Sequence, residues 1–395
     1  MSKKKVLIIG GGYAGIAAAN RLARKNPEVE ITLVTAEPIF REKIRNHQVI
    51  AGTKGKDFQI RNLLNPKIRL IIQRVEKIFP KENKVLLNDG TYFEYDYLGY
   101  TAGMRAGDPG SKGINYFSIA SFQDSERLRK ELNNRPDAKV TVLGGGLSGI
   151  EVATELAENY PNAKITLLDS DKIGKNFSSG AVLYMKEVLK NLKVDLIEGE
   201  RGEYLLEDKI KTSSGTQVPH DYCVISAGLV ASDLGKNSGL GSNKIGQVYL
   251  NEYMQVPEYS NIIGAGDAIK LPGEEYSYLR MACATALPMG IYMAERISNL
   301  LGEKSKIGQK PFELAYVGRC VSLGRKEGLF QFLNYDDSPK EKFWTGRLGA
   351  FVKELICKFT VFSFKAEKYF DFYAIPRPKE KTLVKENERL ATAEK

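Results

Sequence analysis

One segment of the chain occurs twice. Residues 6–35 read VLIIGGGYAGIAAANRLARKNPEVEITLVT, and they align without a gap on residues 140–169, which read VTVLGGGLSGIEVATELAENYPNAKITLLD, at a constant offset of 134 positions. In each copy an apolar run leads into glycines, a segment rich in alanine and leucine follows, and a second apolar run ends the unit. Short apolar runs on either side of a helical pattern are typical of a β-α-β unit. The sequence therefore predicts an α/β fold in which this unit is used twice.

Both copies carry the pattern G-x-G-x-x-G between the first strand and the helix. Its glycines are Gly10, Gly12 and Gly15 in the first copy and Gly144, Gly146 and Gly149 in the second. The first glycine permits a tight turn, the second lets the backbone approach a pyrophosphate, and the third allows close helix–strand packing. The amino terminus of the helix adds free N–H groups and a partial positive charge. We therefore predict two dinucleotide sites, with glycine turns in nucleotide-free units as the alternative.

An acidic residue about 20 positions after the last glycine binds the adenosine ribose in such units. In the second copy this position is Asp169. Its charge would repel a 2′-phosphate, so NADH is favoured over NADPH, although the nearby Lys172 keeps NADPH open. In the first copy the position is Thr35, with Glu37 two residues later. The sequence leaves open which of these two contacts the ribose.

The cysteine and histidine content excludes several other kinds of site. The chain has four widely spaced cysteines without a C-x-x-C pair, and its only histidines are His47 and His220. A thioredoxin-like dithiol, a zinc ribbon and a histidine-rich metal site are thereby excluded, so no metal site is predicted. No apolar run approaches the roughly 18 residues of a spanning helix, and the run after Lys5 is too short for a signal peptide. We expect a cytoplasmic protein.

Further motifs follow the two glycine loops in a fixed order. They are Thr101-Ala102-Gly103 after the first loop, Glu151 in the helix of the second, then Ser226-Ala227-Gly228, and finally Gly266-Asp267. In this arrangement the chain resembles the two-dinucleotide flavoproteins, the FAD-dependent pyridine nucleotide oxidoreductases, over about residues 5–305. The resemblance implies two Rossmann-like domains of the glutathione-reductase type, with FAD in the first and NADH in the second, plus a small C-terminal α+β region.

The resemblance also implies roles for single residues. Asp267 would accept a hydrogen bond from the flavin ribitol, and Glu151, the candidate catalytic residue, would lie near the nicotinamide unless it is a solvated helix carboxylate. Arg41 and Lys43 are candidate flavin or phosphate contacts, or else surface cations. The expected FAD contacts are Gly10, Gly12, Tyr13, Ala14, Gly15, Thr35, Glu37, Arg41, Lys43, Val75, Ala102, Gly103, Gly266 and Asp267, and the expected NAD contacts are Gly144, Gly146, Ser148, Gly149, Asp169 and Gly228.

The same comparison suggests domain boundaries. The FAD-binding domain is expected at residues 1–112 and 247–311, the NAD-binding domain at 113–246, a C-terminal domain at 312–373, and a flexible tail at 374–395. Two helices can be placed within these limits. One begins near Ser121 and stops at Arg135-Pro136. The other begins near Pro288, with proline in its first turn, and would aim its positive end at the flavin.

Departures from the family pattern argue against some subfamilies and favour others. Residues 38–52 contain no cysteine and no histidine follows His220, which argues against disulfide reductases. Cys283 and Cys320 are weak candidates for the cysteine pair of sulfide:quinone oxidoreductases. Residues 312–333 resemble the segment before the membrane anchor of type II NADH dehydrogenases. However, residues 284–288 lack the quinone-contacting A-Q-x-x-x-Q sequence of those enzymes, so the acceptor is in doubt.

The segment after residue 343 has the pattern of an amphipathic helix. Apolar residues at 344, 348, 351, 352, 355, 359 and 362 follow helical spacing, and Lys353, Lys358 and Lys365 fall among them. Residues 340–370 hold seven basic and three acidic side chains. This composition predicts a helix that lies on an anionic membrane surface, and the alternatives are packing on the protein's own core or on a homodimer partner.

These features predict an FAD enzyme that oxidises NADH and passes two electrons to a quinone, peripheral on the cytoplasmic membrane. One alternative is a soluble FAD-dependent NAD(P)H reductase of a small electron-carrier protein. Another is a redox-regulated binding protein similar to apoptosis-inducing factor, which the net charge of +10 would suit. Nucleic-acid binding is not expected, because the basic residues are spread out and no nucleic-acid motif is present.

Overall fold

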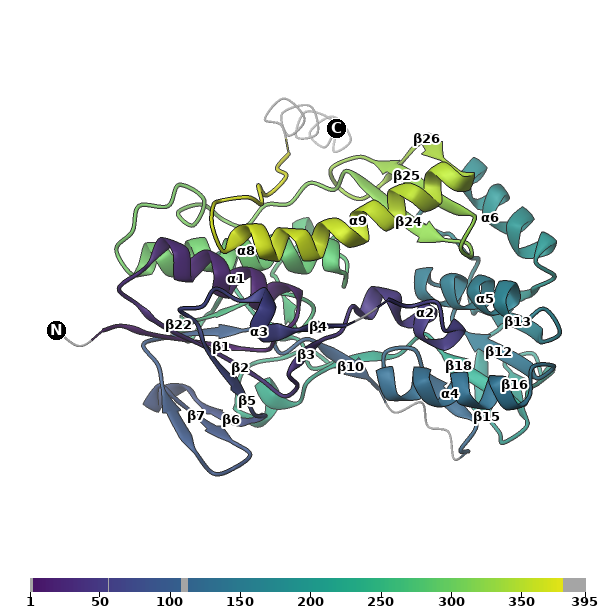
Figure 1. Cartoon of the computed structure of the whole chain (residues 1–395), viewed down its shortest axis with the longest axis horizontal. Helices are drawn as coiled ribbons and strands as arrows, with labels where there is room; N and C mark the ends of the chain where they lie inside the picture. The colour runs from purple at the N-terminus through teal and green to yellow at the C-terminus, as the bar shows by residue number, and fades with distance from the viewer. Residues whose placement is uncertain (1–2, 56, 108–112, 379–395) are drawn as a thin grey trace, which may run out of the picture.

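Two parallel sheets lie side by side along the long axis of the molecule (Figure 1). The structure, a computed structural model, describes residues 3–55, 57–107 and 113–378. Most of the predicted flexible tail, residues 379–395, lies outside the described residues.

The first sheet has six strands in the order β21-β22-β9-β1-β2-β5. Their bounds are β1 Lys5–Ile9, β2 Glu30–Thr35, β5 Arg69–Ile72, β9 Tyr97–Tyr100, β21 Gln255–Val256 and β22 Tyr259–Gly264. Neighbouring strands are parallel except β21, which pairs antiparallel with β22. Because β22 lies beside β9, the chain returns to this sheet after it has built the second one.

The second sheet has five parallel strands in the order β11-β18-β12-β13-β14. Their bounds are β11 Tyr116–Ser118, β12 Lys139–Leu143, β13 Lys164–Leu168, β14 Asp195–Ile197 and β18 Tyr222–Ile225. The two copies of the repeat keep the same strand register, since Ile8 pairs with Leu33 in the first sheet and Val142 with Leu167 in the second. The repeat in the sequence is thus a repeat in the structure.

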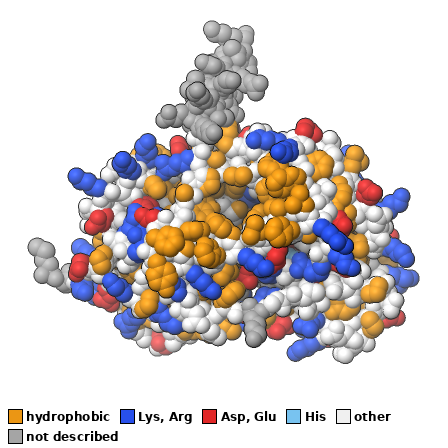
Figure 2. Space-filling model, turned by 45° about the horizontal axis from the view of Figure 1, so that its top comes forward, with side chains coloured by type: hydrophobic (Ala, Val, Ile, Leu, Met, Phe, Trp, Pro, Cys, Tyr) orange, Lys and Arg blue, Asp and Glu red, His pale blue; other side chains and the backbone are white. Residues whose placement is uncertain are grey.

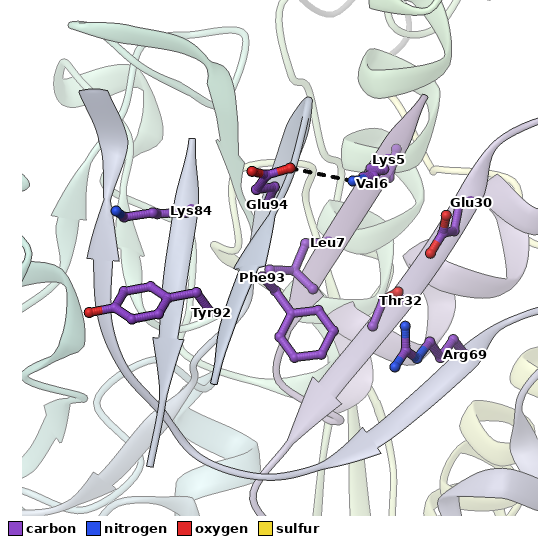
Figure 3. A pocket seen from close by; sticks show the side chains of 10 residues that line it. All are labelled: Lys5, Val6, Leu7, Glu30, Thr32, Arg69, Lys84, Tyr92, Phe93 and Glu94. Atoms are coloured by element: carbon purple, nitrogen blue, oxygen red, sulfur yellow. Dashed lines mark hydrogen bonds and ion pairs between the residues drawn. The ribbon is translucent and has the colours of Figure 1, made fainter. Parts of the chain in front are cut away.

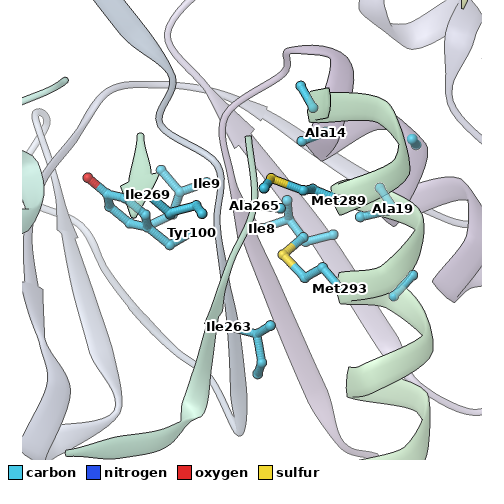
Figure 4. Close-up of a cluster of buried hydrophobic side chains, with 14 of the residues drawn as sticks. Ile8, Ile9, Ala14, Ala19, Tyr100, Ile263, Ala265, Ile269, Met289 and Met293 are labelled. Carbon is cyan, nitrogen blue, oxygen red and sulfur yellow. The ribbon is translucent and has the colours of Figure 1, made fainter. Parts of the chain in front are cut away.

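Six helices of the described chain are longer than ten residues. They are α1 Tyr13–Lys25, α4 Phe122–Asn134, α5 Leu147–Asn159, α6 Ser179–Asn191, α8 Cys283–Leu300 and α9 Gly346–Glu367. On the first sheet α1 and α8 pack closely at Gly290. This residue lies so near the backbone of Ala14 that an added Cβ would overlap it. Figure 4 shows Met289 and Met293 of α8 beside Ile8 and Ala265 in this core. The helix pair and the sheet beneath it form the larger of the hydrophobic cores.

One helix begins where the sequence predicts and another does not. The hydroxyl of Ser121 accepts a hydrogen bond of 3.1 Å from the N–H of Asp124 and caps α4, as expected. The prediction that a helix begins near Pro288 is wrong, because α8 begins at Cys283 and Pro288 lies inside it. Proline has no N–H to donate to the carbonyl of Ala284, and this loss is tolerable because Ala284 is exposed.

The C-terminal region is a small α+β layer. Strands β24 Gly318–Ser322, β25 Gly328–Leu333 and β26 Pro339–Trp344 form an antiparallel sheet. Helix α9 lies along the top of the molecule and reaches from this sheet to α1 (Figure 1). The helix comes close to β25 where two glycines meet, Gly328 in β25 and Gly349 in α9. An added Cβ on either glycine would overlap the backbone of the opposite element. The predicted fold class, two Rossmann-like units plus a C-terminal α+β region, is confirmed.

Shorter elements connect these layers. Three-stranded sheets are formed by β6 Val75–Phe79, β7 Lys84–Leu87 and β8 Tyr92–Glu94, and by β15 Gly202–Leu205, β16 Lys209–Thr212 and β17 Gln217–Pro219. Two-stranded pairs are β3 Ile39–Phe40 with β4 Phe58–Gln59, β10 Met104–Ala106 with β19 Leu229–Ala231, and β20 Val248–Tyr249 with β23 Ile269–Lys270. The short helices are α2 Asn46–Ala51, α3 Ile60–Leu63 and α7 Leu234–Asn237. Among the described helices, none is long and apolar enough to cross a membrane.

Candidate functional site

The two glycine loops have the same local geometry. Gly10 has φ +108° and Gly144 has φ +107°, a region that side chains other than glycine rarely adopt. A Cβ on Gly149 would overlap the carbonyl oxygen of Gly144, and a Cβ on Gly15 would overlap that of Gly10, so the third glycine permits the close packing of helix and strand. By contrast, a Cβ on Gly12 or on Gly146 would meet nothing within 4 Å. The second glycine of each loop therefore borders open space, as a pyrophosphate cradle requires.

Each glycine loop accepts a hydrogen bond from a hydroxyl group on a neighbouring strand end, that of β9 for the first loop and that of β18 for the second. The Thr101 hydroxyl donates to the carbonyls of Ile9 at 2.7 Å and Gly10 at 3.1 Å. The Ser226 hydroxyl donates to the carbonyl of Gly144 at 2.6 Å. These two residues lead into the predicted small-residue segments, in which Gly103 and Gly228 both have positive φ. Each predicted segment thus lies against its own glycine loop.

At the first loop, the start of α1 meets the start of α8. The Cβ position of Gly266 lies 3.4 Å from Ala14 and 3.8 Å from Ala286. The adjacent Asp267 has a buried carboxylate oxygen, Oδ1, without a hydrogen-bond partner among the described residues. Burial raises the pKa of Asp267 to about 6, against the opposing charge of Lys43. A buried carboxylate oxygen without a donor fits a ribitol hydroxyl, so the residues at this loop suit FAD.

The basic residues predicted at this site differ in their surroundings. Lys43 is exposed as a residue, as the alternative of a surface cation expects, but its ammonium donates to the carbonyl of Met104 at 2.7 Å. Partial desolvation lowers the pKa of Lys43, against the opposing charge of Asp267. The Arg41 guanidinium lies 3.7 Å from the centre of the Phe122 ring and donates to Glu37 at 3.0 Å. Both cations are thus held by protein contacts before any ligand is added.

The other residues predicted for FAD are placed as follows. Thr35 ends β2, and its side chain lies beside Gly11, whereas the carboxylate of Glu37 stays half exposed. Tyr13 begins α1 and packs edge-on against Phe40. Ala102 follows Thr101, and Val75 begins β6, in a separate three-stranded sheet. Of the two candidates for the ribose contact, Glu37 has the more exposed side chain and is the one with a carboxylate. Its role in ribose binding stays a prediction.

A pocket of about 320 Å³ opens at the second glycine loop. Its lining comprises Gly145, Gly146, Leu147, Ile150, Asp169, Asp171, Lys172, Gly174, Lys175, Asn176, Phe177, Arg280 and Arg319. The carboxylate of Asp169 accepts hydrogen bonds from the N–H groups of Gly145 and of Asp171, the latter at 2.7 Å. Ser148 is exposed in the first turn of α5. The lining combines a glycine loop, a helix start and a carboxylate, which fits NADH.

Glu151 is buried in the second turn of α5 and is not the solvated carboxylate of the alternative interpretation. Lys353 of α9 places its ammonium nitrogen 2.7 Å from one carboxylate oxygen, and the N–H of Ser322 donates to the same oxygen at 3.1 Å. Nδ1 of His47 in α2 lies 3.5 Å from the other oxygen. The prediction that Lys353 belongs to a membrane-facing set of lysines is therefore wrong, since it ends at a buried carboxylate.

Charge in this cluster is held by one ion pair. Burial alone would raise the pKa of Glu151, but the charge and hydrogen bond of Lys353 and the N–H of Ser322 outweigh it, and the pKa lies below its ordinary value. Burial would lower the pKa of Lys353, and Glu151 raises it above its ordinary value. Burial lowers the pKa of His47 to about 4, so the imidazole is neutral at neutral pH. His47 therefore contacts Glu151 as an uncharged group.

Comparison with known proteins decides the family. A family model described as pyridine nucleotide-disulphide oxidoreductase matches residues 4–291. The chain belongs to this family. The membership confirms the predicted class of enzyme, an FAD-dependent oxidoreductase that uses NADH.

Relatives in the same range of length agree with this assignment, and solved structures share the fold. The chain is 26% identical over 360 residues to ferroptosis suppressor protein 1 of Mus musculus, covering 87% of this chain and 90% of the relative. It is 24% identical over 398 residues to a type II NADH:quinone oxidoreductase of Staphylococcus haemolyticus, covering 91% and 96%. The fold matches sulfide:quinone oxidoreductase of Aquifex aeolicus at 20% identity with a TM-score of 0.79, covering 95% of this chain and 98% of that one. It also matches NDH2 of Plasmodium falciparum at 14% identity with a TM-score of 0.78, covering 96% and 100%.

Within this oxidoreductase the thiols near Lys353 are poor nucleophiles. Burial raises the pKa of Cys283 to about 12 and that of Cys357 to about 11, although the charge of Lys353 opposes both shifts. Burial likewise raises the pKa of Cys320. The thiolate is the reactive form of cysteine, so protonated thiols at neutral pH do not favour sulfide chemistry at this site.

A second and larger cavity of the oxidoreductase, about 450 Å³, lies away from the glycine loops. It is lined by residues at the start of β1 and β2 and by the sheet of β7 and β8, among them Lys5, Glu30 and Phe93 (Figure 3). In open α/β sheets ligands bind at the carboxyl ends of the strands, whereas Lys5 and Glu30 mark the amino ends. Lys5 is already paired there with Glu94 at 3.5 Å. The smaller pocket at the second loop is therefore the better candidate for the nucleotide.

Helix α9 has one face packed on the oxidoreductase and one face exposed. The exposed face, which we call the apolar face, consists of Leu348, Phe351, Leu355, Phe359 and Phe362, each between 43% and 64% exposed. The cations Arg347, Lys358 and Lys365 are exposed on the same helix. Apolar side chains gather on this side of the molecule with basic side chains around them (Figure 2). The predicted helical spacing is confirmed from residue 348 to residue 362, but its first position is wrong, because Trp344 ends β26 and α9 begins at Gly346. The exposed apolar area calls for a partner.

Five functional candidates were missed by reasoning from the sequence: His47, Arg280, Arg319, Asp337 and the Lys353–Glu151 pairing. For Lys353 a signal was present, because Lys353, Cys357, Val361 and Phe364 follow one another at helical spacing, and the last three are buried. His47 and the arginines stand in segments without a recognisable motif.

Proposed function

We propose that the protein oxidises NADH and transfers two electrons through FAD to a quinone that it meets at an anionic membrane surface. One observation carries this proposal. A single helix, α9, reaches the buried Glu151 through Lys353 and exposes the apolar face on its other side. The relative from Staphylococcus haemolyticus is named as a type II NADH:quinone oxidoreductase, which supports a quinone as the acceptor.

The residues of the two loops account for binding and orientation. The space beside Gly12 and Gly146, at the starts of α1 and α5, is open, and backbone N–H groups of the two helix starts would bind two pyrophosphates there. Asp267 would orient the ribitol of FAD, and Asp169 the adenosine ribose of NADH. FAD, when bound, would supply the chemistry, which is two-electron transfer from NADH to the quinone. The protein's contribution to this step is geometry, which needs no acid–base residue at the nicotinamide.

The Glu151–Lys353 pair holds a protonated ammonium group inside the protein. Glu151 raises the pKa of Lys353 above its ordinary value, so at neutral pH this ammonium would act as a fixed positive charge and not as the donor of the two protons that a quinone consumes on reduction to a quinol. Glu151 neutralises the charge of Lys353 and fixes its position, so Glu151 acts as a positioning residue. The neutral imidazole of His47 packs against the same cluster as an uncharged polar group.

The apolar face and its cations suit an anionic lipid surface. A helix binds at the headgroup level when it buries apolar side chains and places basic ones beside the phosphates. Such a surface would also deliver a quinone, which is itself dissolved in the lipid. Contacts on the other face of α9 hold the helix on the protein. The Phe364 carbonyl accepts a hydrogen bond from Asn20 at 2.8 Å, and Glu367 pairs with Arg21 at 2.6 Å.

Point substitutions on the apolar face test the membrane part. Deletion of the helix would instead remove Lys353 and Glu367 and expose the core. We expect Leu355→Glu combined with Phe359→Glu to abolish flotation with vesicles of anionic phospholipid, while FAD content and NADH:ferricyanide activity stay unchanged. Leu206→Glu, an exposed leucine next to β15, is the matched control and should float normally. Undiminished flotation of the double variant would contradict the proposal.

Turnover with different acceptors tests the quinone part. We expect a short-chain, water-soluble quinone to be reduced much faster than oxygen. A rate with quinone no faster than with oxygen, together with a high rate with a small iron–sulfur carrier protein, would instead favour the carrier reductase.

A further inference from the structure

The pocket at the second glycine loop is closed by two arginines from outside the repeated unit. Arg280 precedes α8, which packs on the first sheet, and Arg319 lies in β24 of the C-terminal sheet. Both line the same pocket as Gly146 and Leu147, where α5 begins. Side chains from three parts of the chain thus converge on one space.

Fixed protein contacts hold both guanidinium groups in place. Arg280 lies with its guanidinium carbon 4.2 Å from the centre of the Tyr316 ring, and its Nε is 3.3 Å from the carboxylate of Asp337. Arg319 pairs with the same carboxylate and donates to the carbonyl of Asn176 at 2.7 Å. The Arg319 side chain is only 4% exposed. The pair is therefore preorganised and carries one more positive than negative charge.

Two of their donors have no acceptor. Nη2 of Arg280 and Nε of Arg319 are buried and lack a hydrogen-bond partner among the described residues. Buried charged donors are nearly always satisfied, so this arrangement is unfavourable until a ligand supplies acceptor oxygens. The start of α5 contributes its own free N–H groups to the same pocket.

We propose that Arg280 and Arg319 bind the pyrophosphate of NADH from the side opposite the second glycine loop, with Asp337 as the positioning residue. The proposal rests on the proposed function in that it takes NADH as the occupant of this pocket. A pyrophosphate carries two negative charges and offers oxygens in several directions, so it can accept from a helix start and from guanidinium groups at once. The 2′-phosphate of NADPH is the less suitable group, because Asp169 stands at the ribose position.

This contact would couple the nucleotide to the rest of the molecule. The arginines belong to segments that build the first core and the C-terminal sheet, whereas the glycine loop belongs to the second sheet. Bound NADH would then join all three parts, and loss of the arginines would weaken binding without changing the surroundings of Gly144 or Asp169.

The test compares ligands that differ in their phosphates. For Arg280→Met and Arg319→Lys, we would measure the dissociation constant of ADP-ribose by calorimetry and the rate of FAD bleaching in anaerobic stopped flow. The reductants are NADH, NADPH and reduced nicotinamide riboside, which has no phosphate. We expect the dissociation constant of ADP-ribose to rise at least tenfold, the apparent KM for NADH and NADPH to rise by the same factor, and the rate with the riboside to change less than twofold.

Arg127→Met is the matched control. Arg127 also stacks on an aromatic ring, that of Phe117 at 4.4 Å, and donates to a backbone carbonyl, but it is not among the residues that line this pocket. Its variant should bind ADP-ribose as the unchanged protein does. Asp337→Asn should weaken ADP-ribose binding less than Arg280→Met does.

Three results would overturn the proposal: unchanged ADP-ribose binding in both arginine variants, an equal loss of rate with the riboside, or a loss confined to NADPH. The last would place the arginines at a 2′-phosphate. Failure of the proposed function looks different, because the unchanged protein would then bind ADP-ribose and yet reduce no quinone.

Discussion

Lys353 of α9 places its ammonium nitrogen 2.7 Å from the carboxylate of Glu151 in α5, and both side chains are largely buried. The two residues come from the C-terminal helix and from the second repeated unit. Because a buried charge is tolerated only when it is paired, each residue requires the other. The contact therefore joins the helix that carries the apolar face to the helix that begins at the second glycine loop.

Removal of Lys353 should destabilise the protein strongly. We expect Lys353→Met to lower the free energy of unfolding by about 3 kcal/mol, because it leaves the buried Glu151 carboxylate without a cation. The matched control is Lys358→Met, since Lys358 is exposed on the same helix and lies 3.7 Å from its partner Glu354. Thermal melting of the FAD-loaded protein measures both. The double variant Lys353→Met with Glu151→Gln should recover most of the loss, and equal melting temperatures of the two single variants would refute this account.

His47 should make the protein sensitive to mild acid. Its pKa is about 4 in the folded protein and 6.5 ordinarily, so the unfolded chain binds the proton more tightly and stability falls as the pH drops below 6.5. Linkage gives a loss of about 2 kcal/mol at pH 5 relative to pH 8. His47→Gln should flatten this dependence when melting temperatures are compared at pH 5 and pH 8. An equally steep dependence in the variant would show that other groups cause it.

The second and third glycines of the NAD loop should respond differently to alanine. Gly146 has φ −65°, which alanine adopts freely, and its Cβ would point into open space, so Gly146→Ala should fold normally. We expect it to weaken ADP-ribose binding about tenfold, which corresponds to about 1.4 kcal/mol. Gly149→Ala should instead cost about 1–3 kcal/mol of stability, because the added carbon overlaps the Gly144 carbonyl. Melting and calorimetry separate the two effects, and a destabilised Gly146→Ala protein would count against the geometry of the loop.

Asp169 should set the preference for NADH. Its carboxylate already accepts hydrogen bonds from Gly145 and Asp171, so Asp169→Asn can keep the loop in place while it removes the negative charge. We expect the KM for NADPH to fall at least about fivefold, or about 1 kcal/mol, because repulsion of the 2′-phosphate is lost and Lys172 and Lys175 line the same pocket. Steady-state kinetics with both nucleotides measures this, and an unchanged ratio of the two KM values would contradict it.

The repeated units could be predicted from the sequence because local rules determine them. The spacing of the glycines, the apolar runs and the Ser121 cap each act within a few residues, and β1–β2 and β12–β13 accordingly share one register. The start of α8 was mispredicted because proline favours the first turn of a helix, whereas packing against α1 extends this helix back to Cys283.

The charged contacts between distant segments could not be predicted in the same way. Arg280, Arg319 and Asp337 meet only when a loop, a strand and a turn from separate segments fold together, and no spacing in the sequence indicates this. Lysines among apolar residues are typical of membrane-surface helices, and this pattern assigns Lys353 to the lipid side. The assignment is wrong, because Lys353 shares helical spacing with Cys357 and Phe364, which are buried.

The visible absorption spectrum of the purified protein, recorded under anaerobic conditions, tests the central claim most directly. We predict flavin bands that bleach when NADH is added and return when a short-chain quinone follows. A colourless protein that takes up no FAD, or flavin bands that NADH leaves unchanged, would contradict the claim.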